Sequence, residues 1–313
     1  MKKKKYVTWD VQKRIIAFMT TEAWKTTPHS SFNYEAQVTD FFAEFRKINA
    51  TRSPENKFTF NSLMLKVVVE GLKAAPHMNA FIHYNKHTGK GRLDLMEDIH
   101  ISMPTILSNG RMMALKVANC ESKNVDELSD YVKALKLRCD NTNMLQAMTE
   151  LSLYDTVKDG FCGKPLKSIL KFFGSQIGQD KLRLAAPKEM IRQWKVPKTK
   201  RLVMDDLQLG TISVSNFGST YVKLKGSSGV VDLCPFFTTA LVIGSAQDKP
   251  CLIDGELAVG KVMPIGIVYD SRALDLNLIS PFIEKLDEIF ANPQIIYSWL
   301  SPEKDTVAQK VSA

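Results

Sequence analysis

The pattern that most restricts the fold lies in the last third of the sequence, where strand-like segments follow one another without regular intervening helices. Residues 211–217, 239–246 and 261–270 are short runs rich in apolar residues, which is typical of strands. The Asp254-Gly255 pair at the centre of CLIDGELAV predicts a hairpin before the third run. The regular strand–helix alternation of a βα barrel is missing, so that fold is excluded.

Helices are predicted where apolar residues recur with a spacing of 3.6 residues. Asn124 and Glu127 have the spacing of a capping box, and Asn277 is expected to be the N-cap of the last helix. The four helical segments are residues 38–48, 61–75, 125–138 and 277–291. Further strands are expected at residues 30–37, 100–107 and 113–119, the last two separated by turn residues 108–110. Helices and strands are thus mixed and no Gly-rich phosphate loop is present, so we predict an α/β protein, a two-layer sandwich with a mixed β-sheet.

Residues 140–205 do not continue this pattern. Prolines and glycines divide them into pieces such as LKSILKFF and KEMIRQWK, which we interpret as short basic helices in an excursion from the main domain. Residues 164–201 contain eleven Lys or Arg and two acidic residues, a difference of +9 that equals the net charge of the chain. Because the basicity is local, we expect no nucleic-acid binding. We predict a single domain over residues 1–300, with this excursion, and a tail over residues 301–313.

Composition and cysteine usage indicate a cytoplasmic protein. The chain has 313 residues, 44% of them apolar, but no window approaches about 18 uninterrupted apolar residues, the length of a membrane span. No apolar stretch follows the basic start, so no export signal is predicted. The five cysteines are scattered, odd in number and never spaced as CxxC, which favours a reducing compartment over disulfides or a zinc site. His83 and His87 are four residues apart, but HYNKHTGKG is turn-like and no carboxylate is near them in sequence, so no metal site is expected.

Four stretches of sequence, in order, carry a family resemblance. They are KRIIAFMTTEAWKTTPHS, FNSLMLKVVVEGLKAAPHMNA, GTISVSNFGS and the long C-terminal run from Pro235 to Asp275 that ends in DSRALD. From about Thr8 to Pro293 the chain resembles the catalytic domain of the dihydrolipoyl acyltransferases of 2-oxoacid dehydrogenase complexes, a family related to chloramphenicol acetyltransferase. The resemblance implies a chloramphenicol acetyltransferase-like fold, a homotrimer with sites between neighbouring subunits, and acyl transfer between a thioester such as acyl-CoA and a thiol or hydroxyl acceptor. Coenzyme A would be a substrate, and no covalently bound cofactor is expected.

The C-terminal motif departs from the family pattern at the position that matters most for catalysis. Where the family has D-H-R-x-x-D-G, this sequence reads Asp270, Ser271, Arg272, two apolar residues, Asp275 and Leu276. In the family the histidine removes the proton from the attacking thiol, a task that needs a base with a pKa near the working pH. Ser271 cannot do this. The non-catalytic component X of pyruvate dehydrogenase complexes also has serine here, so the resemblance implies weak or absent activity.

The remaining site residues match family positions. Ser215 corresponds to the serine whose hydroxyl stabilises the tetrahedral oxyanion, and Asn216 next to it is expected to support the site. Asp275 matches the carboxylate that orients the site, often through an arginine of the first helix, where Lys13 or Arg14 stands here. Asp270 and Arg272 match as well. We interpret this pair as a buried ion pair that fixes the turn between strand and helix.

Two further questions stay open at the level of sequence. All five histidines lie in the first third of the chain, so none is a local replacement for the missing base. His29 matches the family's T-x-P-H segment, where we interpret it as a structural histidine of the turn between helix and strand; the alternative is a base supplied from another subunit. Residues 164–201 could form a lid, a membrane-surface contact through LKSILKFFGSQIG, or a site for an acidic partner or phosphate. The alternative to an enzyme is therefore a non-catalytic trimeric homologue that binds a ligand or partner and contacts a membrane through this segment.

Overall fold

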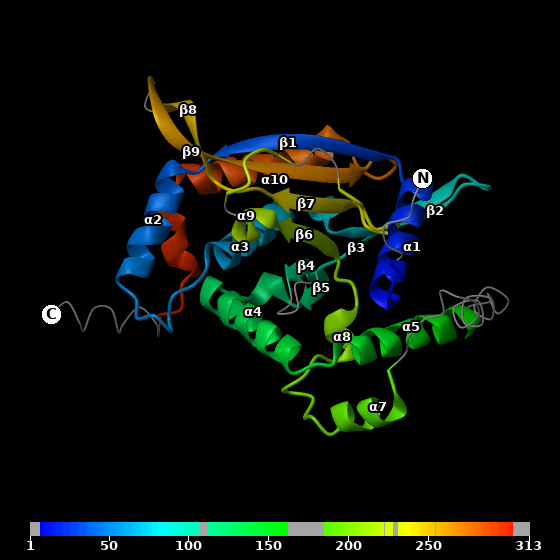
Figure 1. The fold of residues 1–313 in the computed structure, drawn as a ribbon. Helices are drawn as coiled ribbons and strands as arrows, with labels where there is room; N and C mark the ends of the chain where they lie inside the picture. The colour runs from blue at the N-terminus through cyan, green and yellow to red at the C-terminus, as the bar shows by residue number, and fades with distance from the viewer. Residues whose placement is uncertain are drawn as a thin grey trace, which may run out of the picture.

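A seven-stranded mixed sheet forms the centre of the fold (Figure 1). The computed structural model describes residues 7–106, 112–161, 185–221, 223–227, 231–253 and 255–302. The strand order is β1-β9-β7-β6-β4-β5, and β8 pairs with β9. Strand β6 runs parallel to β4 and β7, whereas the other pairs are antiparallel. The strands are β1 His29–Gln37, β4 Ile101–Ile106, β5 Met112–Val117, β6 Ile212–Asn216, β7 Thr239–Ile243, β8 Gln247–Ile253 and β9 Glu256–Asp270.

The predicted strands and the mixed sheet are confirmed, including the hairpin around residues 254–255, in which Ile253 pairs with Glu256. A second, two-stranded sheet was not foreseen. Strands β2 Ala80–Asn85 and β3 Lys90–Leu95 pair across a turn. The interpretation of HYNKHTGKG as a turn is therefore wrong at both ends, because only its middle lies outside the two strands. The turn expected at residues 108–110 lies outside the described residues.

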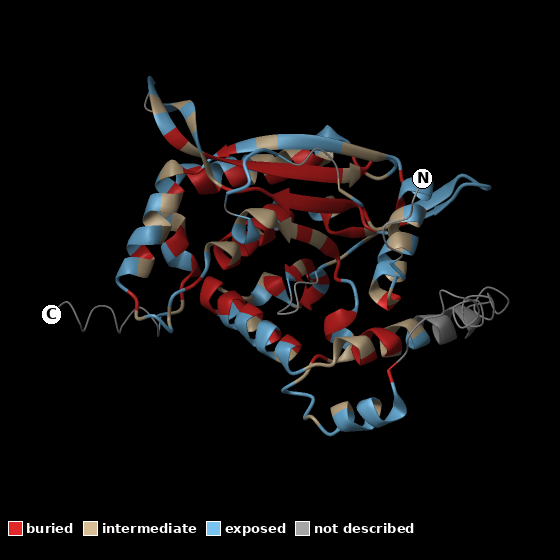
Figure 2. Cartoon of the chain, viewed as in Figure 1, coloured by how far each residue is buried: buried red, intermediate tan, exposed pale blue. Residues whose placement is uncertain are grey.

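Helices cover the sheet, and their apolar residues join its core (Figure 2). Helix α3 buries ten of its residues and packs against α10, whose last turns also contact α2. The capping box of Asn124 and Glu127 at the start of α4 is present as predicted. The helices are α1 Val11–Thr26, α2 Thr39–Ala50, α3 Phe60–Ala74, α4 Val125–Asp140, α5 Met144–Phe161, α7 Pro187–Trp194, α8 Met204–Leu207, α9 Phe217–Thr220 and α10 Leu276–Ala291. Short 3₁₀ turns lie at Pro76–Met78, Cys120–Ser122 and Pro293–Trp299.

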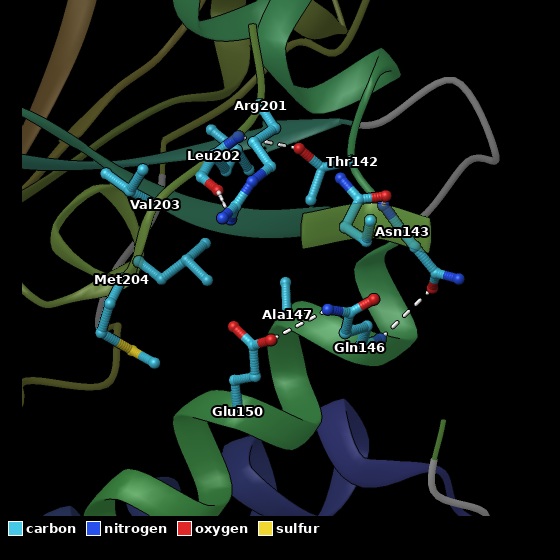
Figure 3. A pocket seen from close by; sticks show the side chains of 11 residues that line it. Thr142, Asn143, Gln146, Ala147, Glu150, Arg201, Leu202, Val203 and Met204 are labelled. Carbon is cyan, nitrogen blue, oxygen red and sulfur yellow. Dashed lines mark hydrogen bonds between the residues drawn. The ribbon is translucent and has the colours of Figure 1, made fainter. Parts of the chain in front are cut away.

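The excursion at residues 140–205 differs from its prediction. It begins with α5, a helix of 18 residues, where only short pieces were expected. The segment LKSILKFFGSQIG lies outside the described residues, and the short basic helix expected at KEMIRQWK is α7. Figure 3 shows polar contacts in this region: the Thr142 hydroxyl accepts a hydrogen bond from the Leu202 backbone N–H, and within α5 the Gln146 amide donates to Glu150. Of the helices whose residues are described, none is both long and apolar enough to cross a bilayer.

Two glycines of the GTISVSNFGS stretch are required by close backbone approaches. A Cβ on Gly210 would lie 2.0 Å from the carbonyl oxygen of His100, and a Cβ on Gly218 would lie 2.2 Å from that of Gly244. These neighbours are backbone atoms directly before β4 and directly after β7, and they cannot move without breaking the backbone hydrogen bonds of His100 to Thr211 and of Gly244 to Pro264. The glycines thus allow β6 to sit between β4 and β7, with Ser215 near its carboxyl end.

Candidate functional site

The DSRALD motif forms the turn between the last strand and the last helix. Strand β9 ends at Asp270, whose side chain is fully buried and binds the Arg272 guanidinium with both oxygens, at 2.9 Å from Nε to Oδ1 and 2.5 Å from Nη2 to Oδ2. Arg272 Nη1 also donates to the carbonyl oxygen of Thr26 at 2.8 Å. The ion pair therefore ties the turn to the end of α1. This geometry agrees with the structural role expected for Asp270 and Arg272, because both charges are used inside the fold.

Ser271, which is expected at the position of the family base, contacts another serine. Its hydroxyl lies 2.6 Å from that of Ser30 on β1, and its backbone N–H donates to the carbonyl of Pro28 at 3.1 Å. Ser271 is exposed, so a substrate can reach it. Neither hydroxyl can accept a proton near neutral pH, since an alcohol becomes a useful nucleophile or base only beside a base. Within the described residues no histidine is hydrogen-bonded to Ser271.

His29 lies much closer to this motif than its sequence position suggested. The pairing of β1 with β9 puts it directly opposite Asp270, so a histidine lies beside the motif although none is near it in the sequence. Side chains alternate along a strand, so His29 and Ser30 point to opposite faces, and Ser30 is the one that meets Ser271. His29 Nε2 instead accepts the backbone N–H of Leu233 at 3.1 Å, and its ring stacks on Trp24 with centroids 4.8 Å apart. His29 is held by these contacts on the far side of the strand from Ser271.

Asp275 has a local structural task. It is the N-cap of α10, with Oδ1 accepting the backbone N–H of Leu278 at 3.1 Å, which corrects the expectation that Asn277 caps this helix. An aspartate at this place satisfies one of the free N–H groups of the first turn. Leu276, which replaces the family glycine, is the first helical residue and is 55% exposed, so the backbone here does not need glycine.

We expect Asp275→Ala to lower the free energy of unfolding by about 1 kcal/mol, the usual contribution of an N-cap side chain. Asp275→Asn should leave stability nearly unchanged, because asparagine caps a helix as well as aspartate does. Urea unfolding of both variants checks this. Equal losses for the two substitutions would show that the charge of Asp275, rather than its cap, is what stabilises the chain.

Ser215 and Asn216 lie on β6, at a distance from Ser271. Ser215 pairs with Val242, which pairs with Gly266, four residues before the end of β9. Strand β6 is parallel to β7 and β7 is antiparallel to β9, so the carboxyl ends of β6 and β9 point to opposite edges of the sheet. At about 3.3 Å per residue the level of Ser215 is separated by roughly 13 Å from Asp270 at the end of β9, and Ser271 lies beyond that end. One copy of the chain therefore does not bring Ser215 and Ser271 together, and Asn216 caps the short helix α9.

Other reactive groups do not supply the missing base. Burial raises the pKa of the Cys234 thiol to about 12, so it is protonated at neutral pH. His83 lies on β2, where Nε2 is 2.8 Å from Asp94 of β3, a carboxylate that is not near it in the sequence. The two side chains meet because the hairpin pairing brings β3 back beside β2. Among the described residues, no three His, Cys, Asp or Glu side chains gather as a metal site.

The structure also reveals site neighbours that the sequence analysis missed. Ser30 follows His29 directly, and only the β1–β9 pairing identifies it as the partner of Ser271. Tyr84 on β2 lies under the Arg272 guanidinium, with 5.5 Å from its carbon to the ring centroid. The sequence signal for Ser30 was its place directly after the T-x-P-H segment, but nothing local distinguishes Tyr84 from other exposed aromatic residues.

Comparisons with known proteins agree with this architecture. Residues 2–150 and 184–297 match the model of the family described as 2-oxoacid dehydrogenases acyltransferase (catalytic domain). The residues between the two matched parts fall in the excursion. The succinyltransferase component of the 2-oxoglutarate dehydrogenase complex of Rickettsia felis is 31% identical over 94 residues, which are 30% of this chain and 22% of that protein. The alignment thus spans about a fifth of this relative's length.

Solved structures share the fold at low sequence identity. A dihydrolipoamide acetyltransferase of Azotobacter vinelandii superposes with a TM-score of 0.63 at 17% identity and covers 94% of each chain. The cubic core of a pyruvate dehydrogenase multienzyme complex gives a TM-score of 0.63 at 16% identity, again over 94% of each chain. At these identities the structural likeness shows only the shared fold, whereas the match of residues 2–150 and 184–297 to the family model shows the family. The chain belongs to the family of 2-oxoacid dehydrogenase acyltransferase catalytic domains.

Proposed function

We propose that copies of this chain assemble into a trimer whose sites between subunits bind an acyl-CoA or a related thioester, and that acyl transfer there is weak or absent. The observation that carries the proposal is the hydrogen bond between Ser271 and Ser30 at the position of the family base. A pair of hydroxyl groups can bind a polar substrate but cannot remove the proton of a thiol. Coenzyme A would be a substrate or ligand, without any covalently bound cofactor.

The topology supports a site shared between copies. Ser215 is the residue proposed to stabilise an oxyanion, yet it lies near the opposite edge of the sheet from Ser271 in the same chain. A site that uses both serines therefore needs Ser215 from one copy and Ser271 from its neighbour. The structural relatives include the core of a multienzyme complex, in keeping with assembly of this fold into oligomers.

Exposed apolar side chains give the assembly a driving force. Two regions carry them: α1 with the residues before it, and the hairpin of β8 and β9. The residues are Trp9, Ile16, Phe18 and Trp24 in the first region and Leu252, Leu257 and Val259 in the second. Large exposed apolar groups clustered on one element are typical of contact surfaces. Burying them between copies would contribute the hydrophobic free energy that a trimer requires.

The size of the expected catalytic defect follows from the chemistry. A positioned general base contributes about 10²–10⁴-fold to the rate. A thiol with a pKa of about 8.5 is still a few per cent ionised at neutral pH, so a slow reaction can proceed on thiolate taken from solution. We therefore expect residual transfer that is slow compared with an enzyme that has the histidine. In a protein with no transfer at all, the preserved site would serve to bind the thioester or a partner.

Isothermal titration calorimetry with coenzyme A and acetyl-CoA, combined with light scattering, tests the proposal. We expect saturable binding of both ligands and a trimeric mass at micromolar concentration. The matched variant is Ser215→Ala, which should keep the trimer and the binding. A strict monomer would remove the shared site from consideration, and a trimer that binds neither ligand would contradict the thioester part of the proposal.

A further inference from the structure

Helix α7 has an amphipathic pattern, but its apolar side is not buried. Pro187 stands in the first turn, where its missing N–H costs nothing. No residue of the helix is buried; Ile191 is 53% and Trp194 56% exposed. Figure 1 shows α7 at the edge of the molecule beyond α5, and Figure 2 shows almost its whole length exposed.

Polar contacts hold the helix to the rest of the protein. The Gln193 side chain bonds both to the backbone N–H of Asn143 and to the carbonyl of Asn141, and the Met190 carbonyl accepts from Gln146. The indole N–H of Trp194 donates to Glu150 at 2.8 Å. The helix is therefore held in one orientation by Gln193, the Met190 carbonyl and the indole N–H of Trp194, while Ile191 and much of the Trp194 ring stay exposed.

Basic side chains lie beside the exposed apolar residues. Lys188, Arg192 and Lys195 are spaced four and three residues apart, so they form a stripe next to Ile191 and Trp194. Two more basic residues follow in the next loop, Lys198 and Lys200. All five are exposed, and none has an ion pair with any residue that the structure describes.

The nearest acid of the helix does not neutralise this charge. Glu189 accepts the backbone N–H of Ala186 at 3.1 Å and so completes the start of the helix. The surface of α7 and the following loop, residues 187–200, therefore carries unbalanced positive charge around two exposed apolar side chains. We refer to it as the α7 surface.

We propose that the α7 surface binds the headgroup region of an anionic phospholipid membrane. Trp prefers the boundary between headgroups and acyl chains, and Lys and Arg reach from that depth to phosphate groups. The charge of such a membrane complements the unpaired cations, each of which adds to binding near an anionic surface. An acidic protein would match the charge but would leave Ile191 and the Trp194 ring without an apolar partner. The inference does not depend on acyl transfer.

The test uses the full chain and co-sedimentation with vesicles of phosphatidylcholine alone or mixed with phosphatidylserine. We expect binding only to the mixed vesicles, weakening steeply as salt rises and the Debye length falls below about 10 Å. The triple variant K188Q/R192Q/K195Q should bind roughly 100-fold more weakly, because each neutralised residue near the surface costs about fivefold. Ile191→Ser should weaken binding roughly tenfold, since it removes apolar area that the lipid would cover.

The matched control is K57Q/K86Q/K136Q, which removes three other exposed lysines and the same net charge. It should change binding by less than the α7 triple variant. Equal losses in the two triple variants, or no binding to the mixed vesicles at low salt, would overturn the proposal. The surface would be assigned to an acidic protein partner instead if the affinity for soluble polyglutamate equalled the affinity for vesicles and Ile191→Ser left the polyglutamate affinity unchanged. Vesicle binding is measured without any thioester, so its outcome is independent of the proposed acyl-CoA site.

Discussion

Ser271→His is expected to raise acetyl transfer from acetyl-CoA to a small dithiol by about 10²-fold over the wild-type protein. The substitution puts an imidazole beside a turn that is already fixed by the ion pair of Arg272 with the buried Asp270 carboxylate. It also replaces the hydroxyl that now bonds to Ser30. The rate of dithiol acetylation, measured at saturating acetyl-CoA, checks this. Ser30→Ala is the matched control, because it removes the same hydrogen bond without supplying a base, and it should not raise the rate.

Leu276 decides how complete the rescue is. Leu276 is an exposed first residue of α10, so we expect its side chain, and not the backbone, to hinder the approach of substrate. We therefore expect Leu276→Ala and Leu276→Gly to increase the rate of the Ser271→His protein by similar factors. A gain from glycine alone would show that the turn needs a conformation closed to other residues.

Ser215 provides the opposite check on the same assay. In the Ser271→His background, Ser215→Ala should remove most of the gained rate, because the oxyanion would lose a hydrogen-bond donor. Robust wild-type turnover that Ser215→Ala leaves unchanged would falsify the proposal, since the chemistry would then occur elsewhere. A Ser271→His/Leu276→Gly protein that binds coenzyme A but stays inert would identify a ligand-binding protein that no longer supports the reaction.

The second large effect is expected for stability, at the buried ion pair of Arg52 and Asp126. Their side chains are 1% and 2% exposed, and Nη1 of Arg52 lies 2.5 Å from Oδ1 of Asp126. Asp126 also accepts the backbone N–H of Ser301, so this pair links α4 to the chain after α10. We expect Asp126→Asn to lower the free energy of unfolding by about 3–5 kcal/mol, because it leaves a buried guanidinium without its counter-charge. Urea denaturation measures this.

An exposed ion pair serves as the control for that experiment. Lys261 and Asp248 also form a short ion pair, but Asp248 is 66% exposed, so Asp248→Asn should cost no more than about 1 kcal/mol. Combining Arg52→Met with Asp126→Leu should recover much of the loss, since a buried pair can be replaced by apolar groups of similar size. If Asp126→Asn and Asp248→Asn lowered the free energy of unfolding by equal small amounts, burial would add nothing to the stabilisation by the Arg52–Asp126 pair.

Much of the architecture could be read from local patterns. The predicted helices appear at α2, α3, α4 and α10 with shifts of a residue or two at their ends, because the apolar spacing that defines a helix is contained within the helix itself. The hairpin at residues 254–255 was found from its turn residues in the same way. The excursion was harder, since α5 has only a weak segregation of apolar and polar residues along its length and gave no periodic signal.

The sequence by itself determined the family motif and the absence of histidine at position 271. The sequence also contains the two glycines, Gly210 and Gly218, but only the close backbone contacts in the structure explain why no larger residue fits at these positions. These features are properties of single positions, so a sequence comparison is enough to find them.

Only the tertiary structure decided which residues surround Ser271. The pairing of β1 with β9 brings Ser30 to Ser271 across 241 residues, while the alternation of side chains turns His29 away. The strand directions separate Ser215 from Ser271 within one chain, and Asp275 is seen to cap a helix. The physical reason is that strand pairing depends on hydrogen bonds between distant segments, which leave no trace in the spacing of residues along the chain.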